Sequence, residues 1–279
     1  MVIDAHCHVL PAGFQDRRTG LLARDATFRT LFARGYAPMA TAEALIGTMD
    51  QARVSRAVVM GMGWTDRVLA REVNDYIIES VARHPGRLSG FCSVNPVWGD
   101  DALAEVERCA RAGTKGIGEL HPDTQGFDIT DEAGLAPLMA AARRLGLPVL
   151  VHASEPVGHQ YPGKGATTPY KLYRFIENFQ SNTIVCAHWG GGLPFYALMP
   201  EVSEVIKNVY FDMAASPFLY RSEVVHTVVD LVGPDRILFG TDFPLIQPQR
   251  LLRQVKESGI DAADVAAILG GNAARLLGL

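Results

Sequence analysis

Short apolar segments alternate with longer amphipathic segments along the whole chain. The apolar segments predict strands at 3–8, 57–60, 88–94, 115–120, 149–152, 183–188, 209–212 and 236–241. The segments between them predict helices at about 41–52, 66–83, 100–112, 135–145, 170–178, 194–206, 221–232 and 248–258, and a last one at 261–270. In the fourth of these helices, apolar residues recur at helical spacing on one face: Leu135, Leu138, Met139, Ala142 and Leu145.

This alternation indicates the fold. Eight strand–helix units in about 250 residues are typical of a (β/α)8 barrel. The sequence therefore predicts an α/β protein with a single TIM-barrel domain over residues 1–279, because no change in composition marks a linker. An open, doubly wound sheet is the alternative, but the glycine fingerprint that follows its first strand is absent. Residues 10–40 predict a long irregular loop or lid, because they contain Pro11, Gly13, Gly20, Gly35 and Pro38.

Composition narrows the class of protein. With 48% hydrophobic and 20% charged residues and a net charge of −4, the chain is typical of a soluble globular protein. The absence of a basic run argues against a nucleic-acid or membrane partner, and no apolar stretch reaches the roughly 18 residues of a membrane span. The N-terminus lacks the features of a secretory signal. Four scattered cysteines without a C-x-x-C pair predict buried, reduced thiols and a cytoplasmic location. We expect a small-molecule substrate and consider a homodimer the candidate assembly.

The first strand carries the first candidate ligands. Successive side chains of a strand point to opposite faces, so Asp4, His6 and His8 are expected on one face, and Cys7 on the other in the core. The two imidazoles, about 7 Å apart along the strand, form a pair that can bind one divalent ion.

Further metal-binding side chains stand at the ends of the later strands. In a TIM barrel, functional groups gather at the C-terminal ends of the strands. The sequence therefore predicts a metal site at this end of the barrel, built from His6, His8, Glu119, His152, His188 and Asp242.

Each of these residues, taken alone, has a plainer explanation. His152 could be a core histidine bonded to a backbone carbonyl, and Asp242 could cap the turn into Pro244. Glu119 could pair with Lys115. Their joint placement at the same level of the barrel argues against these explanations.

Four motifs carry a resemblance to a known family. They are D-A-H-C-H at 4–8, V-H-A at 151–153, A-H-W-G-G at 187–191 and F-G-T-D-F-P at 239–244. Together with the ending G-N-A-A-R-L-L-G-L, they resemble the amidohydrolase superfamily, and within it the amidohydrolase-related (amidohydrolase 2) branch of TIM-barrel hydrolases and decarboxylases. The resemblance implies that His6, His8, His152 and Asp242 hold a divalent metal, usually zinc. It also implies that His188 is a ligand of a second metal or a catalytic acid or base.

Glu119 is the residue on which the branches differ. The decarboxylase-like members have, as a rule, no metal-binding carboxylate on the fourth strand, whereas a strand-four Glu bridges two metals in TatD-like nucleases. The segment I-G-E-L resembles the TatD-like pattern, whereas A-H-W-G-G-G is closer to the decarboxylases. One ion and two ions both remain open.

Two catalytic functions fit this set of residues. The leading expectation is a hydrolase that uses a metal-activated water on a small amide, lactone or ester, with Asp242 moving the proton and His188 stabilising the oxyanion. The alternative is a zinc-dependent non-oxidative decarboxylase or hydratase of an unsaturated or aromatic carboxylic acid, in which His188 or Asp242 delivers a proton to carbon. A pocket arginine would favour the second function, and the candidates are Arg17, Arg18 and Arg71. A third, non-catalytic possibility is a barrel that keeps metal as a structural element.

Five more residues are expected to contact substrate, from their places beside the strand ends: Trp64, His121, His159, Trp189 and Asp212. His121 has turn capping at Pro122 as its alternative role, and the tryptophans have packing at the rim. His159 lies in the loop 153–169 above the barrel mouth. Asp212 has a second expected role, which is to orient the other ring nitrogen of a metal-binding histidine.

Overall fold

A closed ring of strands forms the centre of the molecule in the computed structural model, which describes residues 1–35 and 37–279. Its eight parallel strands follow one another in space as they do in the chain: β1 (Ile3–His8), β2 (Arg56–Met60), β3 (Leu88–Cys92), β4 (Gly116–Leu120), β5 (Val149–Val151), β6 (Ile184–Cys186), β7 (Tyr210–Asp212) and β8 (Ile237–Leu238). Backbone hydrogen bonds join the two ends of this sheet. Ala5 N donates to Phe239 O at 2.8 Å, and His8 N donates to Phe243 O at 2.7 Å. The predicted (β/α)8 barrel is therefore confirmed.

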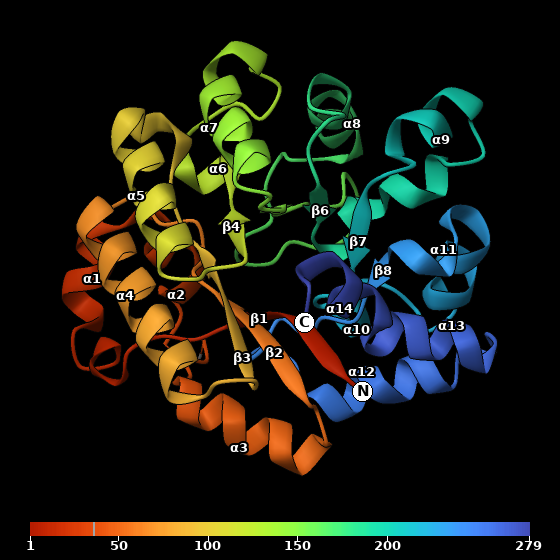
Figure 1. Ribbon diagram of the computed structural model, residues 1–279, viewed down its shortest axis with the longest axis horizontal. Coiled ribbons are helices and arrows are strands. Elements are labelled where there is room, and N and C mark those ends of the chain that lie inside the picture. The colour runs from red at the N-terminus through yellow and green to blue at the C-terminus, as the bar shows by residue number, and fades with distance from the viewer. Residues whose placement is uncertain (36) are drawn as a thin grey trace.

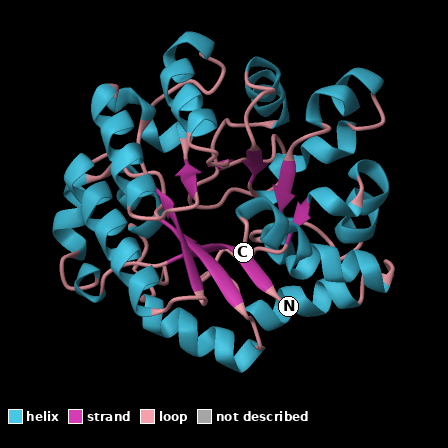
Figure 2. Ribbon diagram, viewed as in Figure 1, coloured by secondary structure: helices cyan, strands magenta, loops and turns pink. Residues whose placement is uncertain are grey.

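Helices form the outer layer around these strands (Figures 1 and 2). The main ones are α3 (Ala42–Ala52), α4 (Arg67–Arg83), α5 (Asp100–Arg111), α7 (Glu132–Arg144), α8 (Pro169–Asn178), α9 (Pro200–Ile206), α11 (Val224–Val232) and α12 (Pro248–Lys256). Two short helices, α13 (Ala262–Ala266) and α14 (Asn272–Leu277), end the chain, and α14 packs against β1 and β8. N-cap side chains explain where some of these helices begin. Asp66 accepts a hydrogen bond from Leu69 N at the start of α4, and Asp131 accepts one from Gly134 N at the start of α7.

The segment 10–40 differs from its prediction as an irregular loop. It contains α1 (Arg18–Arg24) and α2 (Ala26–Phe32), while residue 36 lies outside the described residues. The physical reason is local, because the buried Asp25 carboxylate accepts from Phe28 N at 2.7 Å and so caps α2. Two more short helices follow strands, α6 (Pro122–Gln125) and α10 (Ser216–Leu219).

The predicted helix at 194–206 also differs. A tight 3-10 segment with left-handed residues covers His188–Tyr196, and the regular helix α9 begins only at Pro200, which occupies its first turn. Helix α7 begins at Glu132, three residues before the predicted start at 135. Pro137 therefore lies inside the helix, beyond its first turn. These changes leave the order of strands and helices as predicted.

Two apolar clusters make the core. The larger one lies between strands and helices, and the smaller one fills the barrel below the site with Val58, Met60, Leu150 and Val185 among its members. In β1, Ile3 and Ala5 belong to the inner cluster and Cys7 to the outer one. A register shift between Asp4 and Cys7 interrupts the alternation.

This shift corrects one expectation about β1. Asp4 pairs with Ala57 on the outer side of the barrel instead of sharing a face with His6 and His8. Its buried carboxylate accepts hydrogen bonds from Thr241 N at 2.9 Å and Thr241 Oγ1 at 2.7 Å. Asp4 therefore ties the first strand to the segment that follows the last one.

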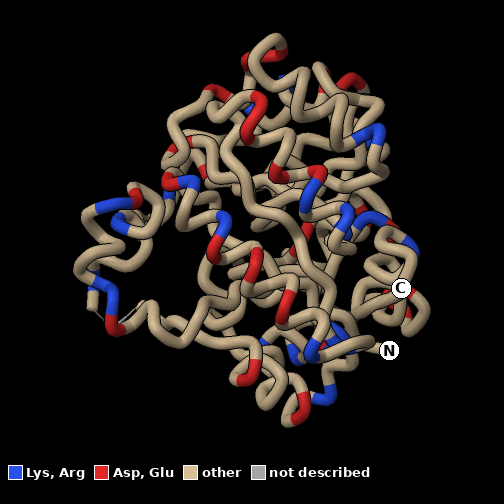
Figure 3. The backbone as a smooth tube through the Cα atoms, turned by 60° about the vertical axis from the view of Figure 1, so that its left-hand side comes forward, with Lys and Arg blue, Asp and Glu red and all other residues tan. Residues whose placement is uncertain are grey.

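The charged side chains of the described residues are spread over the molecule. Figure 3 shows Lys and Arg positions interspersed with Asp and Glu positions along the backbone. Among the described residues, no helix combines the length and the apolar character needed to cross a bilayer. All four cysteines are buried and unpaired, as predicted. A cytoplasmic location and a homodimer stay predictions.

Candidate metal centre

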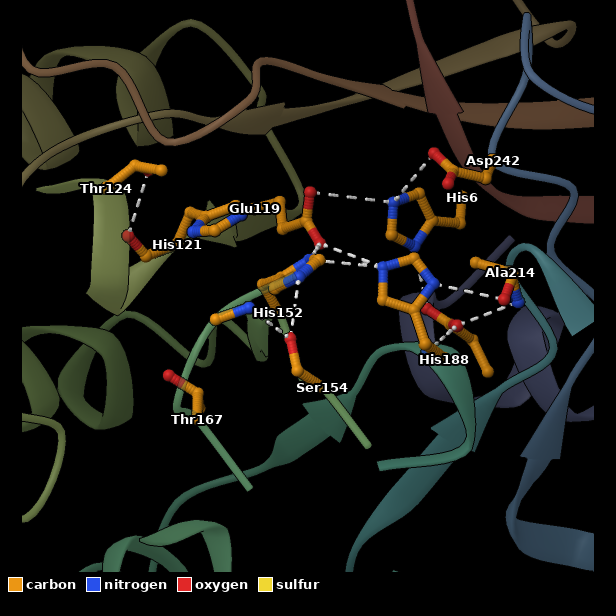
Figure 4. A network of polar contacts seen from close by, with 12 residues as sticks. His6, Glu119, His121, Thr124, His152, Ser154, Thr167, His188, Ala214 and Asp242 are labelled. Carbon is orange, nitrogen blue, oxygen red and sulfur yellow. Dashed lines mark hydrogen bonds and ion pairs between the residues drawn. The ribbon is translucent and has the colours of Figure 1, made fainter. Parts of the chain in front are cut away.

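The predicted metal-binding side chains meet at the C-terminal ends of the strands. Figure 4 labels His6, Glu119, His152, His188 and Asp242. His6 and His8 end β1, and Glu119 lies on β4. The other three directly follow strands: His152 comes after β5, His188 begins the segment after β6, and Asp242 lies shortly beyond β8. The barrel therefore brings together residues that are up to 236 positions apart in the chain, here Asp242 and His6.

The Glu119 carboxylate lies between two groups of histidines. Its Oε2 is 3.6 Å from His8 Nε2 and 3.9 Å from His6 Nε2. Its Oε1 is 3.0 Å from His152 Nδ1 and 3.5 Å from His188 Nε2. Both groups, each taken with Glu119, have their donor atoms within 4.8 Å of one another.

Asp242 joins the first group. Its Oδ1 is 3.2 Å from His8 Nε2 and 3.9 Å from His6 Nε2, and 15% of its side chain is exposed. The two Nε2 atoms of His6 and His8 are themselves 3.1 Å apart. Nitrogen and oxygen donors in this number are those that divalent transition metals bind.

The hydrogen bonds of the Nδ1 atoms show whether the Nε2 atoms of these histidines are free to bind a cation. His6 Nδ1 donates to Asp212 Oδ2 at 2.8 Å, His8 Nδ1 to Met60 O at 3.3 Å, and His188 Nδ1 to Ala214 O at 3.0 Å. Because these oxygens accept, each neutral imidazole carries its hydrogen on Nδ1 and leaves Nε2 as a bare lone pair. In these neutral forms the lone pairs of His6 and His8 face each other at hydrogen-bond distance, so a positive charge, either a proton or a metal ion, is needed between them. Such an arrangement fits a metal ion, and the donor set therefore fits the divalent metal.

The charges of the site favour a cation as well. Burial lowers the pKa of His6, but the carboxylates of Asp212, Glu119 and Asp242 outweigh it and raise this pKa to about 9. Burial likewise lowers the pKa of His188, but its hydrogen bond to Glu119 and the neighbouring carboxylates raise it to about 10. Burial would raise the pKa of Glu119, yet the histidines around it hold that pKa well below its ordinary value. Positive charge at this place is thus strongly stabilised.

A left-handed turn places His188. The φ angles of His188, Trp189, Gly190 and Gly191 lie between 56° and 61°, and Gly192 has a φ of 98°. At Gly191 a β-carbon would lie 2.5 Å from Ser154 O, so only glycine fits. The glycine run of the H-W-G-G-G motif therefore serves the turn that carries the histidine.

Asp212 supports the site from below and does not line the cavity. It is fully buried, and in addition to His6 Nδ1 its carboxylate accepts from His188 N at 2.9 Å and from Ala214 N at 3.0 Å. Of the two roles expected from the sequence, the structure places it for orienting a ring nitrogen.

An apolar cavity of about 390 Å³ opens above the cluster. His8, Glu119, His152, His188 and Asp242 line its floor. Most of its walls come from connections after the strands, and apolar side chains dominate them: Leu31, Phe32, Met62, Phe218, Leu219 and Leu245. No sequence signal had marked these residues, because α2 and α10 are too short, and the other wall residues too isolated, to show a clear apolar period. Tyr161 also lines the cavity, and its hydroxyl donates to Glu155 Oε2 at 2.8 Å.

The five residues expected to contact substrate separate into two sets. His121 and His159 line the cavity, with His121 buried and His159 exposed. Trp64, Trp189 and Asp212 are fully buried and do not belong to the described lining, and both tryptophans lie in the core. The Trp189 indole donates to Ser216 Oγ at 2.9 Å, which satisfies its polar atom away from the cavity.

None of the three candidate arginines lies among the described lining residues. The Arg17 guanidinium pairs with Glu72, and Arg71 lies 4.0 Å from Glu105. Arg18 donates to the backbone carbonyl of Phe32.

Relatives of known activity share most of this chain. The 2-amino-3-carboxymuconate-6-semialdehyde decarboxylase of Dictyostelium discoideum is 28% identical over 243 residues, which cover 76% of this chain and 67% of the relative. The gamma-resorcylate decarboxylase of Polaromonas sp. is 23% identical over 254 residues, which cover 75% of this chain and 76% of the relative. The crystal structure of a 5-carboxyvanillate decarboxylase from Novosphingobium aromaticivorans, which holds manganese, superposes with a TM-score of 0.81 at 18% identity, over 100% of this chain and 97% of that one.

These relatives correct the expectation of hydrolysis. The sequence-based prediction placed a hydrolase of amides, lactones or esters first, mainly because of Glu119. The two curated relatives described above and a third, the 6-methylsalicylic acid decarboxylase of Penicillium expansum, are instead decarboxylases, which agrees with the alternative.

The family itself is shown by a match over nearly the full chain. The family model described as "Amidohydrolase" (Amidohydro_2) matches residues 3–279. Assignment of the whole chain to one domain stays a prediction, although one sheet and this match both extend along it. With its barrel, its histidine and carboxylate cluster and this match, the chain belongs to the amidohydrolase superfamily, as an enzyme of the amidohydrolase 2 family.

Proposed function

We propose that this protein is a divalent-metal-dependent, non-oxidative decarboxylase of an aromatic or unsaturated carboxylic acid. The observation that carries the proposal is the apolar cavity of about 390 Å³ whose floor is the histidine and carboxylate cluster. Its walls suit a planar apolar ring, while its floor suits an acid group. The activities of the curated relatives support the same reaction.

The residues that would hold the metal are His6, His8, His152 and Asp242, with Glu119 as a further ligand. A bound divalent cation would supply positive charge that orients the substrate carboxylate and an adjacent oxygen atom. The imidazole-rich donor set favours zinc, and manganese is the metal named for the solved decarboxylase from Novosphingobium. Metal analysis of the purified protein distinguishes the two.

His188 is the proposed proton donor. It lines the cavity floor, and its bond from Nδ1 to Ala214 O fixes the ring so that Nε2 faces the reacting group. The carboxylates around His188 raise its pKa to about 10 and so favour the imidazolium form, in which Nε2 also carries a proton. This proton moves from Nε2 to the carbon that bears the carboxylate. The bond from that carbon to the carboxylate then breaks, its electron pair returns to the ring, and CO2 leaves. Asp242, which also lines the floor, is the second candidate for this proton transfer.

The walls contribute by excluding water. Phe32 and Leu31 of α2 and Phe218 and Leu219 of α10 surround the space above the floor. With few water molecules near the reacting carbon, the charges of the floor are screened less and act more strongly on the substrate.

The experiment is a test for CO2 release with purified protein loaded with zinc or manganese. We would offer 2,6-dihydroxybenzoate, 6-methylsalicylate and 5-carboxyvanillate and follow the loss of each acid together with CO2. We expect at least one acid to be decarboxylated, with activity lost on chelation and restored by metal. His188→Gln should lower kcat by about 10²–10⁴-fold with bound metal unchanged. Failure to release CO2 from any of these acids or their hydroxylated analogues, with metal bound, would overturn the proposal.

A further inference from the structure

Residues 155–164 form a loop beside the cavity, which we call the flap. Its two ends are joined, because Ser154 N donates to Thr167 O at 2.9 Å and Gly165 N donates to Ser154 Oγ at 2.9 Å. Asp123 fixes the outgoing end, since its carboxylate accepts from Thr167 N at 3.1 Å and from Thr167 Oγ1 at 2.8 Å. Ser154 and Thr167 are labelled in Figure 4. Surface loops whose ends are joined in this way, known as Ω-loops, are frequently functional.

The side chains of the flap bond mainly to the flap itself. Tyr161 Oη donates to Glu155 Oε2 at 2.8 Å. Lys164 Nζ donates to Val157 O at 2.6 Å and to His159 O at 3.0 Å. The same ammonium group lies 5.6 Å from the centre of the Tyr161 ring. Because these bonds connect its two sides, the flap can move as one body about its joined ends.

One carboxylate connects the flap to another wall of the cavity. His159, Tyr161 and Pro162 of the flap line the cavity. Among the described residues, a single hydrogen bond connects the flap to a wall from a different part of the chain, and it runs from Tyr220 Oη to Glu155 Oε1 at 3.4 Å. Tyr220 directly follows α10, which provides part of that wall. The Glu155 carboxylate thus accepts from one tyrosine inside the flap and from one outside it, and this pair of bonds fixes the flap in its closed position.

The closed position has a cost at His121. Gly163 of the flap lies against this histidine and α2, because a β-carbon added at Gly163 would come 2.9 Å from Leu31 Cδ2 and 3.6 Å from His121 Nε2. Nε2 is buried and has no hydrogen-bond partner among the described residues. A buried polar atom without a partner destabilises the folded state. Opening the flap would return this atom to water and remove the cost.

We propose that the flap is the entrance gate of the cavity and that Glu155 is the positioning residue that keeps it closed. When the flap opens, a ligand enters; when it closes, Tyr161 and His159 complete the wall that excludes water. The bonds of Glu155 favour the closed position and the buried Nε2 of His121 opposes it, so the flap moves between the two. This inference goes beyond the proposed function, because it concerns entry to the cavity and holds for any reaction at its floor.

Limited proteolysis of the zinc-loaded protein measures how often the flap opens. Trypsin cleaves after Lys164 only when this segment leaves its folded position, whereas cleavage after the exposed Lys207, which follows α9, serves as the internal reference. In Glu155→Gln the single amide oxygen cannot accept from both tyrosines, so we expect cleavage after Lys164 to become about tenfold faster relative to cleavage after Lys207. Glu177→Gln is the matched control, because it removes a carboxylate on α8 that pairs with Arg174, and it should leave this ratio unchanged.

Exchange of the metal provides a second readout. We would measure the rate at which dipicolinate removes zinc from the protein and, separately, the equilibrium affinity for zinc. Because the metal reaches the floor through the cavity, a flap that opens more often should speed both binding and release about tenfold and leave the affinity unchanged. Tyr220→Phe removes the bond between the wall and the flap but keeps the bond between Tyr161 and Glu155, so we expect the same changes at a smaller size.

Three outcomes would overturn the inference. The first is wild-type rates of cleavage and of zinc exchange in both Glu155→Gln and Tyr220→Phe. The second is cleavage after Lys164 and Lys207 that rises together, and the third is weaker zinc affinity at unchanged exchange rates, because both indicate a general loss of structure. The melting temperature of each variant shows whether it is folded. Since none of these measurements requires turnover, the inference and the proposed function fail independently.

Discussion

The carboxylate of Asp212 provides the most direct test of how the metal centre is held together. It accepts one hydrogen bond from His6 Nδ1 at 2.8 Å and two from the backbone N–H groups of His188 and Ala214, at 2.9 and 3.0 Å. Asp212→Asn keeps the shape but replaces one oxygen by an NH2 group, which cannot accept. If that group faces His6, the imidazole must accept at Nδ1 and carry its hydrogen on Nε2, the atom that faces His8.

The expected magnitude follows from the bonds that are lost. Either orientation of the amide removes at least one hydrogen bond to a charged acceptor, which contributes about 1.5–3 kcal/mol. Because about 1.4 kcal/mol corresponds to a tenfold change in an equilibrium constant, we expect metal affinity to fall by about 10- to 100-fold.

The assay is competition for the metal with a chromophoric chelator. Asp25→Asn is the matched control, because Asp25 is also fully buried and accepts from the backbone N–H groups of Phe28, Thr65 and Asp66 at 2.7, 2.7 and 2.8 Å. We expect this control to lower the melting temperature but to keep wild-type metal affinity. Unchanged affinity in Asp212→Asn, or an equal loss in the control, would refute the role assigned to Asp212.

Three further changes test the site and the fold. Glu119→Gln removes the charge between the two histidine groups and should weaken metal binding at least about tenfold by dialysis and elemental analysis; full retention would remove Glu119 from the ligand set. Gly191→Ala places a β-carbon 2.5 Å from Ser154 O at a φ of 61°, so we expect a loss of about 2 kcal/mol or more in thermal unfolding, whereas Gly13→Ala, with nothing within 4 Å, should cost little. Burial raises the pKa of Asp4 to about 6 from 3.8, so its contribution to stability is full below about pH 4 and lost as the pH rises through 6. The fall in melting temperature between pH 5 and 7.5 should therefore be smaller in Asp4→Asn than in the wild type, and equal falls would contradict this pKa.

The sequence predicts those features that depend on the periodicity of apolar residues and on the position of a residue relative to the end of a strand. Short apolar strands and amphipathic helices repeat regularly, so the barrel follows from the alternation alone. The convergence of His152, His188 and Asp242 follows from the same rule, since all three come within four residues of strands that end at one face.

Features that depend on a local irregularity of the backbone cannot be predicted from the periodicity of the sequence. Asp4 was placed on the wrong face because a register shift in β1 cannot be read from alternation. Trp189 was expected in the cavity because it adjoins His188, but the left-handed turn buries its ring in the core. The helix α2 was missed because glycine and proline residues dominate its surroundings, although Asp25 and Phe28 form a recognisable cap.

The preference for hydrolysis was wrong for a different reason. The prediction was based on the metal-binding residues. These residues determine where charge is stabilised in the site, and both hydrolysis and decarboxylation can use such a site. The proposed decarboxylation rests instead on the wall of the cavity, which α2, α10 and the loop around Tyr161 provide. These segments differ from the strand ends that carry the ligands, so the walls can change while the cluster stays intact. A barrel of this kind can therefore keep its ligand cluster while the residues of the wall determine which substrate it accepts.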